Sequence, residues 1–306
     1  MKKAKLLILI SLFYNVAVFA QQDPLFTQYT FNKLLVNPAY AGSREGVTVN
    51  VINRAQWVNI DGAPNTMVLS AHGSFREKRV GLGAYLTRDA IGPVVNTSLM
   101  GTYSYRILMD NSAFSFGLQG GLRYFDYNWA LMNLKDADYV YDPSDVRSIT
   151  PDFNIGVYYQ SNRFFAGLSS KQLLENEVGF TQYNERTSFD KLVRHFFFMS
   201  GTVFPIADKI MFRPSTLVKF VQNTPVQIDL NASVLFNQQF MVGVSYRTQN
   251  AITAMMEIGI TNSIRLSYSY DMYFNELQLY NYGSHEIRLE FDLKMSESRM
   301  LTPRYF

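Results

Sequence analysis

The residue types that most often carry enzyme chemistry are scattered in this sequence. The three histidines, His72, His195 and His285, lie far apart and share no metal-ligand spacing. No serine occupies a Gly-x-Ser-x-Gly elbow, and no glycine-rich loop ends in Gly-Lys. Gly81 and Gly83 belong to an alternating pattern, and no helix is expected after them to bind a phosphate. We therefore predict no enzyme activity, with no catalytic residue, no cofactor and no metal site at these positions.

Oxygen atoms that could bind calcium are concentrated between Asp126 and Pro151. The segment carries five aspartates and three tyrosines: Asp126, Asp136, Asp138, Asp142, Asp145, Tyr127, Tyr139 and Tyr141. Carboxylates are good calcium ligands, but their spacing lacks the glycine turn and the distal glutamate of an EF-hand loop. A solvated outer loop is the default expectation and calcium binding stays an alternative. The tyrosines also suit contact with a protein.

Charged residues recur on the polar side of segments in which polar and apolar residues alternate. They are Arg106, Arg123, Asp229, Arg247, Glu257, Arg265, Asp271, Arg288 and Glu290. Because alternate residues of a strand point to one face, these charges should line a common surface. Two interpretations stay open. The charges either form ion pairs that brace a wall or hold the terminus of a bound polypeptide.

Strict alternation indicates the β-strands that must position these residues. In one clear example, Val226, Ile228 and Leu230 alternate with Gln227 and Asp229. Such a period predicts strands with one apolar and one polar face. We expect about fourteen strands, an even number as in bacterial outer-membrane barrels. The expected strands start near Gly46, Asn65, Val80, Val95, Ala113, Asp152, Phe164, Leu192, Ile210, Pro225, Phe240, Ala251, Ile264 and Ser284.

The lengths of the connections distinguish a membrane barrel from a soluble sandwich, since both have two-faced strands. Connections after even-numbered strands are short: Arg76–Arg79, Leu108–Ser112, Gln160–Arg163, Pro205–Lys209, Phe236–Gln239 and Thr261–Ser263. Connections after odd-numbered strands include every long one: Val58–Pro64, Arg88–Pro93, Asp126–Pro151, Lys171–Lys191 and Met272–Gly283. This segregation predicts an all-β fold, a transmembrane up-and-down antiparallel β-barrel in the outer membrane. Both termini would then lie in the periplasm, with the polar face lining the lumen.

The N-terminus carries the pattern of an export signal. Lys2, Lys3 and Lys5 precede the apolar run Leu6–Val18, and a small-residue cleavage site ends at Ala20. We expect residues 1–20 to be a signal peptide, 21–45 a periplasmic or plug-like segment, 46–293 the barrel and 294–306 a periplasmic tail. The absence of cysteine excludes disulfides and thiolate metal sites. The net charge is only +3, and we expect no nucleic-acid partner.

Two stretches that flank the first expected strand carry an unusual, ordered set of residues. They read QDPLFTQYTFNKLLVNPAYAGS from Gln22 to Ser43 and RAQWVNIDGAPNT from Arg54 to Thr66. Together they resemble the opening signature of the PorP/SprF family of type IX secretion and gliding-motility proteins from the Bacteroidota. The matching residues are Gln22, Asp23, Pro24, Gln28, Tyr29, Asn37, Pro38, Ala39, Tyr40, Ala41, Gly42, Gln56, Trp57, Gly62, Ala63, Pro64 and Thr66.

The resemblance implies an outer-membrane component of type IX secretion that docks or anchors a secreted surface protein, such as the C-terminal region of an adhesin. It also implies contact with periplasmic components, including peptidoglycan-binding lipoproteins. Contact with outer-membrane lipid is expected from the apolar outer face of the barrel. Independently of the resemblance, Leu34, Leu35 and Tyr40 make the first stretch too apolar for a disordered arm. We expect it to form a small plug that either seals the periplasmic mouth or couples the barrel to a periplasmic partner.

A different class of function remains as an alternative, a FadL-like or porin-type transporter of small solutes. FadL-type barrels have a similar number of strands and an Asn-Pro-Ala motif much like Asn37-Pro38-Ala39. Such a transporter needs an apolar path for its ligand, whereas the expected lumen face is polar and charged. The charged lumen therefore favours docking over transport.

Overall fold

The computed structural model describes residues 26–44, 46–75, 77–128, 146–182, 185–248, 251–274 and 276–293. Within these ranges the regular structure consists of β-strands and short 3-10 helices. The expected signal peptide and the expected tail, residues 294–306, lie outside the described residues. No helical segment among the described residues is long and apolar enough to span a membrane.

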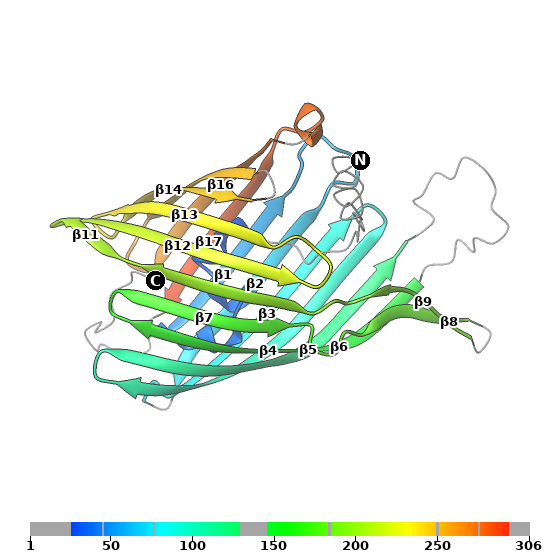
Figure 1. Ribbon diagram of the computed structural model, residues 1–306, viewed down its shortest axis with the longest axis horizontal. Coiled ribbons are helices and arrows are strands. Elements are labelled where there is room, and N and C mark those ends of the chain that lie inside the picture. Colours follow the sequence, from blue (N-terminus) through cyan, green and yellow to red (C-terminus); the bar gives the residue numbers. More distant parts are fainter. Residues whose placement is uncertain are drawn as a thin grey trace, which may run out of the picture.

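The barrel wall is a single antiparallel sheet that closes on itself (Figure 1). Its first half consists of β1 (Val47–Ala55), β2 (Asn65–Phe75), β3 (Val80–Ile91), β4 (Val94–Met109), β5 (Ser112–Tyr127), β6 (Val146–Ser161) and β7 (Phe164–Lys171). Its second half consists of β10 (His195–Thr202), β11 (Phe204–Ala207), β12 (Ile210–Val221), β13 (Gln227–Phe236), β14 (Phe240–Arg247), β15 (Ala251–Gly259), β16 (Ile264–Tyr273) and β17 (Ser284–Leu293).

Two pairings close the ring. β1 pairs with β17 over its whole length, from Val47 opposite Leu293 to Ala55 opposite His285. β10 pairs with both β7 and β12, and β11 continues the β10 side of β12 in the same register. Counting β10 and β11 as one interrupted strand, the 15 strands of the sheet make a 14-strand barrel, which confirms the predicted fold.

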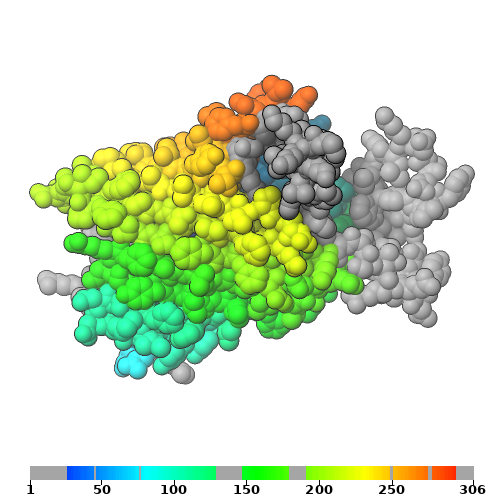
Figure 2. Space-filling model, in the orientation of Figure 1, coloured from blue at the N-terminus to red at the C-terminus, as the bar shows by residue number. Residues whose placement is uncertain are grey.

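The two faces of the wall differ as the alternation predicts. Large apolar side chains point outward and are exposed, for example Leu99, Leu118, Leu168, Leu230 and Ile258. Their neighbours along each strand are buried inside the barrel. On the face of the barrel drawn in Figure 2, the side chains of adjacent strands pack into a continuous wall. An outward apolar belt around a polar interior is the arrangement of an outer-membrane barrel.

The observed strands start within three residues of the expected positions at every strand but one. The expected start at Asp152 was wrong, because β6 begins at Val146. The expected loop Asp126–Pro151 was therefore also wrong, since its first two residues belong to β5 and its last six to β6. Pro151 pairs with Leu122 of β5, while the pairing of β6 with β7 begins only at Ile155. A proline is tolerated there because no strand needs its missing N–H group.

The connections at the two ends differ in length. After β2, β4, β6, β11, β13 and β15 the connections are short turns, at 76–79, 110–111, 162–163, 208–209, 237–239 and 260–263. The long connections lie at the other end, where 172–194 contains the hairpin of β8 (Glu177–Gln182) and β9 (Glu185–Lys191). This hairpin extends beyond the barrel in Figure 1. The expected loop Arg88–Pro93 was wrong, since β3 and β4 are joined by only residues 92–93.

The lumen is occupied by the segment Phe26–Ser43, which we call the plug. It consists of three short 3-10 helices, η1 (Thr27–Thr30), η2 (Lys33–Leu35) and η3 (Pro38–Tyr40). The plug is the dark blue ribbon inside the barrel in Figure 1. Seventeen of its eighteen residues are buried, with Thr30 as the exception. A segment without regular strand pairing is stable there because side chains of the wall satisfy its backbone groups.

Candidate functional site

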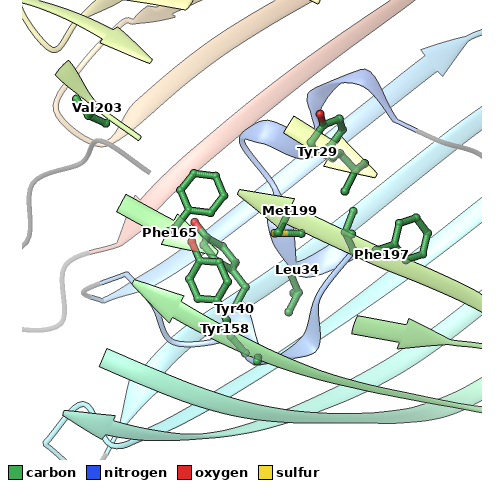
Figure 3. Close-up of a cluster of buried hydrophobic side chains, with 12 residues drawn as sticks. Tyr29, Leu34, Tyr40, Tyr158, Phe165, Phe197, Met199 and Val203 are labelled. Carbon is green, nitrogen blue, oxygen red and sulfur yellow. The ribbon is translucent and has the colours of Figure 1, made fainter. Parts of the chain in front are cut away.

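The plug is held first by apolar packing against the wall. Leu34, Tyr40 and other plug residues form one cluster with Tyr158 of β6, Phe165 of β7 and Met199 of β10, which Figure 3 shows. The Tyr40 ring meets the Tyr158 ring edge-on, with centroids 5.5 Å apart. Burial of this kind stabilises each large side chain by about 1.5–3 kcal/mol. The cluster therefore fixes the plug across the middle of the lumen.

Four glycines of the wall form a seat for the segment Asn37–Gly42. They are Gly81 of β3, Gly117 of β5, Gly156 of β6 and Gly167 of β7, and we call them the glycine seat. A Cβ atom on Gly117 would lie 2.1 Å from the Ala39 nitrogen. A Cβ atom at each of the other three would come within 2.7 Å of plug atoms. Backbone of the plug thus lies directly against Gly81 and Gly117, and the Asn37 side chain lies directly against Gly156 and Gly167, because no wall side chain intervenes.

Asn37 joins the glycine seat to the β6–β7 ladder by hydrogen bonds. Its Oδ1 accepts from the Ala39 nitrogen at 2.9 Å and caps η3. Its Nδ2 donates to the Val157 carbonyl at 2.9 Å and to the Leu168 carbonyl at 3.2 Å. These bonds give both polar atoms of the Asn37 amide a partner inside the barrel, where an unsatisfied amide group would cost about 1–3 kcal/mol.

The end of the plug is fixed by β2 and β4. The Ser104 hydroxyl donates to the Ala41 carbonyl at 2.6 Å, and Arg106 donates to the Gly42 carbonyl. The Gly42 nitrogen donates to Nδ1 of His72 at 3.4 Å. Gly42 has a φ of +71°, which favours glycine, and a Cβ there would lie 2.6 Å from the Gly81 Cα. His72 therefore contributes to holding the plug.

The start of the plug is fixed by a buried ionic triad of Arg54, Asp271 and Glu286. Arg54 binds Asp271 at 2.6 Å and Glu286 at 2.9 Å. The Glu286 carboxylate also accepts hydrogen bonds from the backbone nitrogens of Thr27 and Gln28, each at 3.0 Å. All three charged side chains are at most 2% exposed. Removing one member of such a group typically costs about 3–5 kcal/mol, because its partners stay buried and unpaired.

A second ionic network, which we call the central network because Arg288 at its centre binds two carboxylates, lies inside the barrel toward the short-turn end, where Arg265 also donates to the Gln238 carbonyl. Arg288 binds both Glu257 and Glu290, and Arg265 binds Glu257 at 3.0 Å. Arg44, which follows the plug, binds Glu290 at 2.7 Å and reaches Asp292 at 3.8 Å. The Arg288 guanidinium also lies 4.6 Å from the centre of the Phe31 ring. The network therefore joins β15, β16 and β17 to Phe31, which precedes η2, and to Arg44, which follows the plug.

The structure places all nine predicted lumen charges inside the barrel. It brings Glu257, Arg265, Arg288 and Glu290 together in the central network. The others make separate contacts: Asp271 in the triad, Arg106 with Gly42, Arg247 with Asp229 at 2.9 Å, and Arg123 with Asp152 at 2.8 Å.

Sequence reasoning missed several charges that take part in these contacts, among them Arg54, Asp152 and Glu286, and also Arg44 and Asp292 of the central network. Arg54 shares the inward phase of Thr48 and Asn50 on β1, so the period of the strand could have identified it. Asp152 was missed because it was taken as the first residue of its strand. Glu286 was missed because its partner Arg54 lies 232 residues earlier in the sequence.

The signature residues fall in two parts of the structure, and the start of the plug lies at the same end of the barrel as the β1–β2 connection, since Gln28 donates a hydrogen bond to Glu286 and Trp57 donates one to the nearby Ser284. Gln28, Tyr29 and Asn37–Gly42 lie in the plug, whereas Gln22, Asp23 and Pro24 lie outside the described residues. The second part forms the β1–β2 connection at the long-loop end. Gln56, Trp57, Gly62, Ala63 and Pro64 lie in this connection, and Thr66 is the second residue of β2. There the Gln56 nitrogen donates to the Pro64 carbonyl at 2.9 Å.

The described residues offer no grouping of three potential metal ligands. His195 and His285 lie on β10 and β17, where His285 contacts the Tyr268 hydroxyl at 2.7 Å. Of the segment considered for calcium, Asp126 is a strand residue of β5. The other four aspartates lie outside the described residues.

A family model for the type IX secretion system membrane protein PorP/SprF matches residues 18–291. The chain belongs to this family. The family is a membrane component of a secretion system, and transmembrane β-barrels of this kind are outer-membrane proteins. The PorP/SprF protein described here is therefore an outer-membrane barrel of type IX secretion. No curated protein sequence matches it.

Solved structures show the same fold at very low sequence identity. The Ralstonia pickettii toluene transporter TbuX is 8% identical and has a TM-score of 0.52. The match covers 85% of this chain and 93% of the TbuX chain. The monoaromatic hydrocarbon channel CymD is 11% identical and has a TM-score of 0.53. The match covers 88% of this chain and 94% of the CymD chain.

Proposed function

We propose that this PorP/SprF barrel docks a secreted surface protein, such as the C-terminal region of an adhesin, and contacts periplasmic parts of the type IX machinery. The observation that carries the proposal is the plug, which fills the lumen and is held by the wall along its whole length. A barrel with a filled lumen works through its surfaces at the two ends. Gliding motility is the process in which an anchored adhesin would be used.

Two cavities that the described residues form beside the plug are small. One cavity of about 30 Å³ lies between the plug and β12–β15. Another of about 40 Å³ lies between Phe26, Leu35 and β3–β5. Each has room for about two or three water molecules. This packing supports docking, because a steady open pore needs a continuous path past the plug.

The long-loop end offers a surface for a protein partner. Between β16 and β17, Leu279, Tyr280 and Tyr282 are 84%, 68% and 68% exposed. The backbone of this loop is fixed, since the Tyr282 nitrogen donates to the Val58 carbonyl at 2.9 Å. Exposed tyrosines on a fixed loop supply contact area at low cost in conformational entropy. The β8–β9 hairpin adds a projecting edge at the same end.

Affinity purification from detergent-solubilised outer membranes tests the docking proposal. We expect the wild-type protein to recover a secreted type IX protein or a component of the machinery. The double substitution Tyr280→Ser and Tyr282→Ser should reduce recovery of the secreted protein several-fold. A matched control carries Tyr103→Ser and Tyr105→Ser on the outward face of β4. Recovery of neither class of protein by the wild type would overturn the proposal.

Transport of small solutes is the second candidate, and the shared fold with TbuX and CymD favours it. Those proteins are described as a toluene transporter and a monoaromatic hydrocarbon channel. Single-channel recording in planar bilayers separates the candidates. A steady conductance of the wild-type protein supports transport, whereas silence supports docking.

A further inference from the structure

Two positive side chains line the same small cavity between the plug and the wall. Lys33 of η2 and Arg213 of β12 both border the cavity of about 30 Å³. Three other lining residues, Tyr29, Phe165 and Met199, are labelled in Figure 3. Lys33 is only 3% exposed. Two like charges at one buried cavity repel each other unless an opposite charge lies between them.

Neither cation has a carboxylate partner among the described residues. In the part of the chain that the structure describes, no acidic oxygen lies within 4.0 Å of the Lys33 ammonium or the Arg213 guanidinium. The Lys33 Nζ donates to the Thr30 carbonyl at 2.7 Å and lies 4.8 Å from the centre of the Phe165 ring. The polar contact of Arg213 is a long one, 3.9 Å to the Met241 sulfur. Neutral partners of this kind do not balance two charges.

The neighbouring acids are already used. In the central network, Glu257, Glu290 and Asp292 face Arg44, Arg265 and Arg288, so three negative charges meet three positive charges. Lys33 and Arg213 therefore add two unbalanced positive charges to this part of the lumen. Burial, followed by the charge of Arg213, holds the pKa of Lys33 well below its usual range, as expected for a cation without a counter-ion.

We propose that Lys33 and Arg213 bind a small monovalent anion, of the size of chloride, in this cavity. The volume excludes larger anions, since it holds about two water molecules. The Thr30 hydroxyl also borders the cavity, is buried and has no hydrogen-bond partner, so it can donate to the anion. Asn231 Oδ1, a buried acceptor without a partner, also borders the cavity and would face the anion unfavourably.

The anion would enter from the short-turn end of the barrel. Arg213 lies three residues after Ile210, where β12 begins, and is only partly buried. Thr202, another lining residue, ends β10 on the same side of the wall. The bound anion would link the plug to β12, because one of its cationic partners belongs to each. The site thus makes the seating of the plug depend on a small ion.

Thermal unfolding of the purified full-length barrel in detergent tests the site. Chloride is exchanged for gluconate, an anion too large for the cavity, at constant ionic strength. We expect chloride to raise the Tm of the wild type by roughly 2–4 °C. The effect should disappear in Lys33→Met and Arg213→Met. It should persist in the control Lys209→Met, which removes an exposed lysine from the nearby turn.

The readout is the dependence on chloride, since Lys33→Met also removes a buried charge and can raise the Tm in gluconate. Crystals grown in bromide should show anomalous scattering between Lys33 and Arg213. An equal Tm of the wild type in chloride and gluconate would overturn the proposal. So would a chloride effect retained by Lys33→Met, or bromide located only outside the cavity.

Discussion

The glycine seat allows the role of the plug to be tested by a single methyl group. In Gly117→Ala the added Cβ atom would lie 2.1 Å from the Ala39 nitrogen and 2.4 Å from the Pro38 carbonyl carbon. Both are backbone atoms, so no side-chain rotation can relieve the clash. Gly117 itself lies within β5, where alanine fits the strand conformation. We therefore expect the wall to remain intact and η3 to be displaced.

The size of the effect follows from the contacts that the displacement breaks. Overpacking of this kind costs about 1–3 kcal/mol. Lifting η3 also breaks the two hydrogen bonds that Asn37 donates to β6 and β7, each contributing about 0.5–1.5 kcal/mol. Together the loss is about 2–6 kcal/mol of plug attachment. A loss in the upper part of this range leaves the plug outside its seat in a measurable fraction of molecules.

Planar-bilayer recording measures this fraction, and so does limited proteolysis with the protease added at the short-turn end of the barrel. Gly117→Ala should show intermittent channel openings and faster cleavage within Phe26–Ser43 than the wild type. The matched control is Gly101→Ala on β4, where the nearest atom to an added Cβ is 3.8 Å away. If Gly117→Ala stays as silent and as protease-resistant as Gly101→Ala, the packing of the plug against the wall has been misjudged.

Three further predictions concern the buried polar groups. Arg54→Met should lower the free energy of unfolding by about 3–5 kcal/mol, because Asp271 and Glu286 stay buried without their cation; urea unfolding in vesicles measures it, and a loss below about 1 kcal/mol would contradict it. Asn37→Ala should speed proteolysis of the plug without changing the barrel's mobility in gels, since only the bonds to the wall and the cap are lost. Because the pKa of Lys33 is lowered by burial, the unfolded chain binds more protons between that pKa and 10.5. The free energy of unfolding should therefore rise with pH across that window in chloride-free buffer, and Lys33→Met should abolish the rise.

The sequence predicted the wall better than the lumen. Period-two alternation depends on each strand alone, and Val226–Leu230 showed which side of β13 faces lipid without any knowledge of its neighbours. The predicted start of β6 was wrong because proline is rare inside strands, so Pro151 was assigned to the preceding loop. Its tolerance depends on where β7 ends, which is a property of the neighbouring strand.

For the candidate site, the sequence predicted which charged residues face inward but not which residues they contact. The inward charges were found because phase reveals the face on which a side chain lies. Their partners could not be found, because Arg54 meets Asp271 across 217 residues of sequence. The glycine seat was equally hidden. Gly81 reads as ordinary alternation, and its need for glycine arises from the plug backbone that lies on it.

The hydrogen bonds that hold η1 also set the order in which parts of this chain fold. Thr27 donates its N–H to a carboxylate of Glu286, 259 residues further along the chain. The first turn of the plug therefore cannot be fixed until β17, the last strand, has paired with β1. Contacts of such long range form late, since the loop they close costs entropy first. During export the apolar stretch from Phe26 to Tyr40 thus travels unsheltered, and a chain truncated before β17 keeps it exposed for periplasmic chaperones or proteases to recognise.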